Sequence, residues 1–441
     1  MKQHLQNAAC GVLDYAAYPL GMIAAVPILL RGLGATEFGI WAFTVAVINT
    51  GAVLASGFAD ANIQQIAVAR STGDSARVVS CVRTTLSIHV LLGTLLGLAA
   101  YAVAPIMAKS VATAGNELRT CRLSLQIGSV CILLRALETV VVSTQRAFER
   151  YAESVRISAT VRVFSLAVAA LLALHGGSVP QILGASALLL AMGTFAQFVR
   201  LGILVPAHSL LPGYSRDTGR AILRLGTLTW LQATGTAIFG QIDRLFVGIT
   251  FGAVAVGAYS ICMQIAQPIA GTAASAFHFI FPLLARTSSG PEPRIARPIV
   301  IAFFCNLLLV TLASAALFLF GGHLLRAWTT PDVARAGSVI LPFAIFASAL
   351  VGLAVTGVYA MLALGRAAAV VGTTLLAGVA MLASMAWLSH QYGIRGVVTS
   401  RVLFGLVSLA IYIPLARLLR RTTTRDEEVR VLEFSAAQEG A

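Results

Sequence analysis

The sequence predicts an all-α membrane protein of about 12 transmembrane helices, arranged as two parallel six-helix repeats. Three observations predict this fold: the composition is strongly apolar, long stretches carry no charge, and short motifs recur about 216 residues apart. The chain has 441 residues, of which 58% are hydrophobic and 11% charged, whereas soluble domains carry roughly 25% charged residues. A soluble fold of this length could not bury so much apolar surface, so we expect lipid to be its solvent.

The charge-free stretches predict helices rather than a barrel, because they are long and continuous instead of short and alternating. One stretch is divided by a Gly- and Pro-containing hairpin signal at residues 175–180, and another by a glycine break at residues 251–253. The predicted spans are residues 9–30, 39–60, 85–107, 121–144, 157–175, 180–204, 225–250, 254–282, 298–322, 337–360, 367–389 and 394–416.

The basic residues are distributed unevenly between the loops on the two sides. Of 31 Lys and Arg residues, 20 fall on the side that carries the N-terminus, 7 on the other side and 4 within spans. The positive-inside rule therefore predicts that both termini are cytoplasmic. Asp14 interrupts the first apolar segment, so we expect a retained span rather than a cleaved signal peptide. The net charge of +14 reflects topology and contact with membrane lipid, and does not indicate a nucleic-acid partner.

An internal repeat is the most informative structural signal. Four segments of the first half match the second half at an offset of 216 to 218: residues 34–41 with 252–259, residues 69–72 with 285–288, Arg150 with Arg366, and Gly177 with Gly393. Six spans separate the two members of each matched pair, so both members lie on the same side of the membrane. The two repeats are therefore parallel. Transporters use this arrangement to form a substrate path between their halves.

The repeat also predicts the domains: an N-terminal bundle at 1–204, a cytoplasmic linker at 205–224, a C-terminal bundle at 225–416 and a cytoplasmic polar tail at 417–441.

Two hairpins carry a family resemblance. Residues 27–41, PILLRGLGATEFGIW, resemble the first hairpin of polysaccharide flippases of the Wzx type, and residues 243–260, from DRLFVG to GAYS, resemble their seventh-helix hairpin. These flippases belong to the MOP exporter superfamily, with the MATE drug antiporters and the lipid II flippases. The resemblance covers all twelve spans in order and spacing. It implies a V-shaped pair of bundles around a central cavity.

The same resemblance implies an activity. Such a protein moves an undecaprenyl-pyrophosphate-linked oligosaccharide from the cytoplasmic to the periplasmic leaflet of the bacterial inner membrane. It also implies polysaccharide polymerase and chain-length proteins as partners.

Charged residues within the spans are the candidate site residues, because a charge at the bilayer centre costs roughly 2.5–3.5 kcal/mol on insertion scales. A guanidinium binds pyrophosphate bidentately and stays protonated when partly desolvated. We therefore expect four arginines to bind the pyrophosphate: Arg31, Arg135, Arg244 and Arg401. Two glutamines, Gln241 and Gln264, are expected to form hydrogen bonds with the oligosaccharide. Asp14 and Glu138 are the candidates for binding a coupling H+ or Na+.

Simpler interpretations of these charges stay open. Arg135 and Glu138 are three residues apart on one helix face and can form an internal ion pair. Arg31 can anchor a helix end among lipid head groups. Arg162 can extend to the cytoplasmic surface, the interpretation that we favour for it, and Asp60 is expected to cap a helix.

Two other functions stay open: a cation-coupled drug antiporter and a membrane sugar ligase or polymerase. The arginines favour an anionic substrate over cationic drugs. No catalytic motif occurs in a supporting context, and the longest predicted loop, residues 205–224, contains a single acid, Asp217. The seven histidines are scattered, so we expect no metal site, no cofactor and no enzyme activity. His89, alone in an apolar helix, is interpreted as a residue satisfied by a neighbour.

Overall fold

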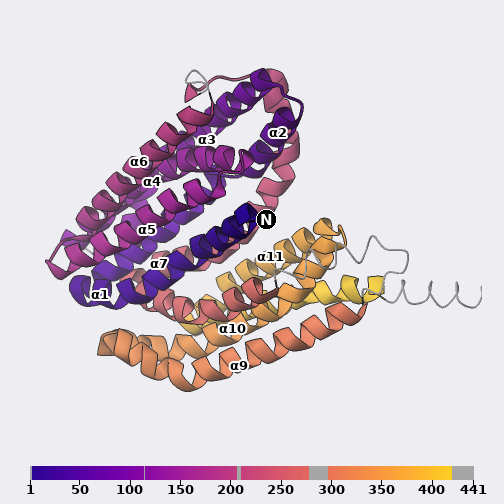
Figure 1. The fold of residues 1–441 in the computed structure, drawn as a ribbon. Helices are drawn as coiled ribbons and strands as arrows, with labels where there is room; N and C mark the ends of the chain where they lie inside the picture. The colour runs from indigo at the N-terminus through magenta and orange to yellow at the C-terminus, as the bar shows by residue number, and fades with distance from the viewer. Residues whose placement is uncertain (1, 114, 206–209, 278–295, 420–441) are drawn as a thin grey trace, which may run out of the picture. The chain divides into compact units, whose positions relative to one another are not determined.

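The computed structural model describes residues 2–113, 115–205, 210–277 and 296–419. Within them, the side chains of residues 2–20, of residue 296 and of a few positions between 225 and 237 are outside the description. The described part consists of helices joined by short turns (Figure 1). Ten of its helical stretches are long and apolar enough to cross a membrane.

The helices are α1 (Lys2–Ala55), α2 (Ala59–Ser71), α3 (Ser75–Val111), α4 (Gly115–Ala147), α5 (Tyr151–Leu174), α6 (Val179–Leu204), α7 (Arg216–Phe277), α9 (Ala296–Trp328), α10 (Pro331–Ala363), α11 (Ala367–Tyr392) and α12 (Ile394–Ser408), which continues through the 3-10 turn η2 (Leu409–Ile411) to Leu419. The backbone of α1 leaves helical geometry at Gly34 and that of α7 at Gly252. Dividing the two apolar stretches that contain these glycines raises the ten described stretches to twelve, in the predicted order.

Most helices begin several residues before the predicted spans; α3, for example, begins at Ser75, ten residues before residue 85. Two of the differences have a local cause. The predicted span 39–60 runs through a turn at residues 56–58, after which the chain continues as α2. The turn forms where Gly57 has low helix propensity, and where the Ser56 hydroxyl bonds back to the Ala52 carbonyl. Helix α7 begins at Arg216, nine residues before the predicted span at 225, because its first turns are polar and escape a search for apolar residues.

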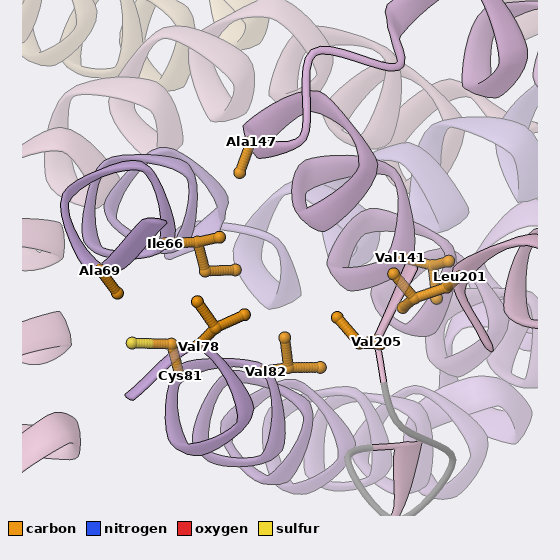
Figure 2. Close-up of a cluster of buried hydrophobic side chains, with 9 residues drawn as sticks. All are labelled: Ile66, Ala69, Val78, Cys81, Val82, Val141, Ala147, Leu201 and Val205. Carbon is orange, nitrogen blue, oxygen red and sulfur yellow. The ribbon is translucent and has the colours of Figure 1, made fainter. Parts of the chain in front are cut away.

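The described residues form two compact units, Met1–Ser260 with Trp328–Ala334, and Ile261–Ala327 with Arg335–Ala441. In the first unit α4 contacts α1, α2, α3 and α6. Figure 2 shows a buried cluster that joins α2, α3, α4 and α6: Ile66, Ala69, Val78, Cys81, Val82, Val141, Ala147, Leu201 and Val205. This packing holds α4, which carries Arg135 and Glu138, against its neighbours.

In the second unit a separate cluster joins the end of α7 to α9, α10, α11 and α12. Its buried members are Phe277, Ile299, Ala302, Ala360, Met361, Val370, Ile411 and Leu415. The domain boundaries expected at residues 204 and 225 derive from the repeat and stay predictions.

The turn between α4 and α5 has the same geometry as the turn between α10 and α11. Glu149 has φ 62° and Gly365, 216 residues later, has φ 69°. The next residues, Arg150 and Arg366, have ψ 44° in both turns. Three backbone hydrogen bonds recur at the same offset, including Arg150 N to Gln145 O at 3.0 Å and Arg366 N to Met361 O at 2.9 Å. The internal repeat is therefore present in the local geometry.

The two hairpin glycines repeat as well. Gly34 has φ 77° and ψ 171°, and Gly252 has φ 82° and ψ −177°, a region of backbone conformation that is essentially restricted to glycine. Five residues after each turn glycine, Gly39 and Gly257 are equivalent in the repeat, and a Cβ on Gly257 would lie 3.3 Å from the Gly39 Cα. A Cβ on Gly39 would overlap the Ala253 carbonyl. Equivalent residues of the two repeats thus meet where no side chain separates them.

The other two matched positions provide less evidence for the repeat. Residues 285–288 lie outside the described residues. Gly393 has φ 57°, whereas in the corresponding first turn the positive φ falls on Gly176 instead of Gly177. These two turns therefore differ in conformation.

Candidate functional site

A polar pocket of about 250 Å³ lies within the first unit, between the end of α1 and helices α2, α4 and α5. Its charged lining residues are Asp60, Arg135, Glu138, Arg146 and Arg162. Its lining hydroxyl groups belong to Ser56, Thr139, Ser143, Ser154 and Ser158. Pockets for drug-sized ligands are roughly 300–1,000 Å³, so this pocket matches a head group better than a whole glycan.

Helical periodicity brings these side chains to one place. Ser154, Ser158 and Arg162 recur every four residues on α5 and therefore share one face. On α4, Arg135 and Arg146 lie eleven residues apart, about three turns, and face the same pocket. The turn at residues 56–58 redirects the chain between α1 and α2, so that both helices contribute to the wall.

The pocket lining includes an ion pair within α4. Arg135 Nη1 donates to Glu138 Oε2 at 2.8 Å, which confirms the predicted pairing. Ser158 Oγ donates to the other carboxylate oxygen, Oε1, at 3.2 Å. The Glu138 side chain is 11% exposed and that of Arg135 is 35% exposed. Glu138 is therefore fixed on both oxygens, while Arg135 is the more accessible partner.

The rest of the Arg135 guanidinium makes no hydrogen bond with the described residues. A guanidinium offers five N–H donors in a planar fork. One N–H of the guanidinium, on Nη1, donates to Glu138, and the remaining N–H donors can bind a ligand in the pocket.

A chain of hydrogen-bonded, buried amide side chains supports the Glu138 carboxylate. Gln197 on α6 donates from Nε2 to the Ser158 hydroxyl at 3.2 Å and to the Ser154 carbonyl at 2.9 Å. Gln145 on α4 donates to Gln197 Oε1 at 2.7 Å. Both glutamines are almost fully buried. They fix Ser158 and, through it, the orientation of Glu138.

The charges favour an anionic ligand. Three arginines and two carboxylates leave an excess of one positive charge among the charged lining residues. The lining hydroxyl groups already donate their protons to backbone carbonyls or, for Ser158, to Glu138, so their oxygens can accept hydrogen bonds from sugar hydroxyl groups.

Helix α7 contacts the turn that forms the pocket wall. Trp230 Nε1 donates to the Leu54 carbonyl at 3.0 Å, which is one of the carbonyls left unpaired at the end of α1. The Trp230 ring stacks on Phe58, with ring centroids 6.1 Å apart and an interplanar angle of 9°. A Cβ on Gly57 would overlap the indole. The turn is thus packed tightly by an aromatic residue from the second repeat.

The structure brings two pairs of predicted site residues together. Arg135 and Glu138 share the pocket. Arg244 donates from Nη1 to Gln241 Oε1 at 3.2 Å on α7, where both side chains are half-buried. Next to them the buried Asp243 accepts a 2.6 Å hydrogen bond from the Tyr259 hydroxyl, which connects the two limbs of the hairpin.

The other predicted site residues lie elsewhere. Arg31 is exposed, three residues before the hairpin glycine of α1. In the second unit, Arg401 lies over the Phe404 ring at 5.3 Å and contacts Met381 Sδ at 3.8 Å, and Gln264 is half-buried. Asp14 belongs to α1, but its side chain lies outside the described residues.

Two pocket residues had other expected roles. Asp60 was expected to cap a helix, but it lies in the first turn of α2 after Phe58, the N-cap residue, and lines the pocket. Arg162 was expected to extend to the surface, but it is half-buried and lines the same pocket. The four-residue spacing of Ser154, Ser158 and Arg162 is the sequence signal that could have placed Arg162 here.

No group of three or more His, Cys, Asp or Glu side chains suited to a metal ion occurs among the residues that the structure describes.

Comparison with solved structures identifies the fold. A multidrug-resistance MATE family transporter of the MOP superfamily, in an inward-facing conformation, matches with TM-score 0.70 and 14% identity over 94% of this chain and 99% of that chain. The lipid II flippase MurJ matches with TM-score 0.75 and 11% identity over 94% of this chain and 87% of that chain. At such identities the likeness is one of fold. The protein has the multi-pass membrane fold of MOP-superfamily transporters.

The family follows from the sequence. A family model described as "Polysaccharide biosynthesis protein" matches residues 28–293, more than half of the chain. The chain belongs to this family of polysaccharide biosynthesis proteins. It is also 25% identical over 315 residues to the uncharacterized membrane protein EpsK of Bacillus subtilis (strain 168), an alignment that covers 69% of this chain. The chain spans 61% of the length of that relative.

Proposed function

We propose that the protein is a flippase that moves undecaprenyl-pyrophosphate-linked oligosaccharide from the cytoplasmic to the periplasmic leaflet, for biosynthesis of cell-surface polysaccharide. Membership of the polysaccharide biosynthesis family carries the proposal. A fold shared with a protein named as a lipid II flippase supports a lipid-linked substrate.

The pocket supports the proposal chemically. The pyrophosphate of the lipid binds to the free donors of Arg135, in a pocket with an excess of positive charge and the size of a head group. Arginine suits this role because its fork matches two phosphate oxygens at once and remains charged away from water. The sugars extend beyond the pocket, which is too small for a whole glycan.

The proposal includes a location and an orientation. We place the protein in the bacterial inner membrane with both termini in the cytoplasm, because 20 Lys and Arg residues lie on that side against 7 on the other. Polysaccharide polymerase and chain-length proteins are its expected partners on the pathway, and Glu138 is the described candidate for a coupling ion.

A leaflet assay tests this function. Purified protein is reconstituted into vesicles that contain undecaprenyl-pyrophosphate-linked oligosaccharide with a fluorescent label on the glycan, and a membrane-impermeant quencher reports the accessible fraction. We expect the protected fraction to become accessible with the protein and to stay protected in protein-free vesicles. Equal protection in both, or transport of a cationic drug instead of the lipid, would refute the proposal.

A further inference from the structure

The first turns of α7 pack one face against α3 and the turn at residues 56–58. Residues of this face recur every four positions, which keeps them on one side of the helix: Thr218, Ile222, Gly226 and Trp230. Thr218 Oγ1 lies 2.8 Å from Ser80 Oγ on α3, and Ile222 is buried in a cluster with Phe58. A Cβ on Gly226 would overlap the Phe58 ring. These contacts fix the rotation of α7 about its axis.

Three arginines lie on the opposite face of the same turns. Arg216, Arg220 and Arg224 each lie two residues from a residue of the packed face, which is about 200° around a helix of 3.6 residues per turn. All three residues are exposed. Because the rotation of α7 is fixed, its arginines point away from α3 and from the turn.

The chain that precedes α7 brings a fourth arginine to this surface. Arg83 Nε on α3 donates to the Leu211 carbonyl at 3.2 Å, and a Cβ on Gly213 would overlap the Arg83 guanidinium. This side chain therefore lies against the segment that leads into α7. Two large exposed side chains, Leu211 and Tyr214, belong to the same segment. The four residues that form what we call the basic surface are Arg83, Arg216, Arg220 and Arg224.

The arginines of α7 lie next to the predicted start of its span at residue 225. Residues four positions apart are separated by roughly 6 Å along a helix axis. Head groups occupy roughly 5–7 Å on each side of the hydrocarbon core, and charges interact over about 8 Å at physiological ionic strength. The basic surface is therefore within reach of lipid head groups. By the proposed orientation, these head groups belong to the cytoplasmic leaflet.

The chemistry of the surface favours an anionic lipid as its partner. Residues 210–224 contain three arginines and a single acid, Asp217. A cluster of four or more basic residues next to a membrane span is typical of segments that bind anionic lipid. Leu211 and Tyr214 are 63% and 60% exposed, and tyrosine is enriched at membrane interfaces. A lipid matches both the charge and the adjacent apolar side chains.

We propose that the basic surface binds the head groups of anionic phospholipids in the cytoplasmic leaflet. The guanidinium groups donate hydrogen bonds to the phosphate oxygens, while Leu211 and Tyr214 lie at the level of the head groups. The segment between the two repeats is thereby attached to the membrane surface. The choice of leaflet rests on the proposed orientation, whereas the binding of phospholipid requires no transport.

Native mass spectrometry of the purified full chain tests this site, because it resolves individual bound lipids. The protein is titrated with phosphatidylglycerol in one series and with phosphatidylcholine in another. We expect phosphatidylglycerol to bind more tightly. The triple variant Arg216→Gln, Arg220→Gln, Arg224→Gln should weaken its first binding step by about tenfold or more, since each basic residue near an anionic membrane contributes roughly fivefold. Lysine at the same three positions should retain most of the preference, because it keeps the charge.

The matched control removes three exposed arginines from the same predicted side of the first unit: Arg150, Arg156 and Arg200. It changes the net charge equally and should leave the first binding step of phosphatidylglycerol unchanged. Equal weakening in both triple variants, or no preference for phosphatidylglycerol in the parent protein, would overturn the proposal.

A third series with undecaprenyl pyrophosphate separates membrane phospholipid from substrate lipid. If the α7 triple variant weakened binding of undecaprenyl pyrophosphate and not of phosphatidylglycerol, the basic surface would belong to the substrate and the proposal would be wrong. All of these measurements are binding equilibria, so their failure is distinct from failure of the leaflet assay.

Discussion

Arg135 differs from Arg244 and Arg401 in pairing with a carboxylate and in lining the polar pocket. Glu138 holds one of its nitrogens, and the remaining N–H groups make no hydrogen bond with described residues. Arg244 and Arg401, in contrast, lie against Gln241 and against Phe404 with Met381. This difference makes Arg135 the residue at which loss of binding is most expected.

Arg135→Gln should weaken equilibrium binding of undecaprenyl pyrophosphate to the purified protein by about tenfold or more, because charge-assisted hydrogen bonds contribute roughly 1.5–3 kcal/mol. Arg135→Lys should recover only part of the affinity, since it keeps the charge and loses the fork. Arg122→Gln is the matched control, because Arg122 is exposed on the same helix and outside the pocket. Equal affinities for Arg135→Gln and Arg122→Gln would contradict this role.

Glu149 is the described non-glycine residue with positive φ, at 62°, and its repeat equivalent is Gly365. A left-handed conformation costs an ordinary residue roughly 1–2 kcal/mol. Glu149→Gly should therefore increase the free energy of unfolding by about 1 kcal/mol, measured by denaturant titration in mixed micelles. Gly365→Glu should decrease it, and effects of the opposite sign would show that the two turns are not equivalent.

At the scale of the helices, the two hairpins depend on glycines that no other residue can replace without strain. Gly34→Ala and Gly252→Ala should each cost about 1–3 kcal/mol of stability, since both positions require a conformation that is nearly exclusive to glycine. Gly372→Ala on α11 is the control, because there is open space around it and the helix should tolerate or prefer alanine. The same unfolding titration compares the hairpin variants with the Gly372→Ala control. A neutral Gly252→Ala would argue against the repeated hairpin geometry.

The turn between α1 and α2 depends on its contact with Trp230. Gly57→Ala should destabilise the protein because the added methyl group overlaps the indole. In a Trp230→Ala background the same change should cost much less, so the two effects should not add. A double-mutant cycle of unfolding free energies measures this coupling, and strict additivity would show that Trp230 does not pack on the turn.

At the scale of the whole molecule, the sequence predicts the features that depend on local residue patterns and on the spacing of residues along the chain. The span order, the hairpin glycines and the pairing of Arg135 with Glu138 all follow from local patterns, and the structure confirms them. The repeat also appears in the dihedral angles at Glu149 and Gly365.

The pocket could not be predicted in the same way. Its residues converge from four helices, and this convergence depends on how each helix is rotated about its axis. In a soluble bundle the apolar face reports that rotation, but lipid is as apolar as the protein core and removes the signal. For this reason Asp60 and Arg162 were expected in other roles. The α1–α2 turn was missed because the charge-free stretch continues through Ser56 and Gly57.

The measurement that tests the central claim most directly is the rate at which reconstituted protein moves labelled undecaprenyl-pyrophosphate-linked oligosaccharide between leaflets. The parent protein and Arg122→Gln should translocate the lipid at similar rates. Arg135→Gln should be slower by about tenfold or more, in line with the charge-assisted hydrogen bonds that it loses. Equal rates for Arg135→Gln and Arg122→Gln, or no translocation by the parent protein, would contradict the claim that the Arg135 pocket binds the lipid-linked glycan for export.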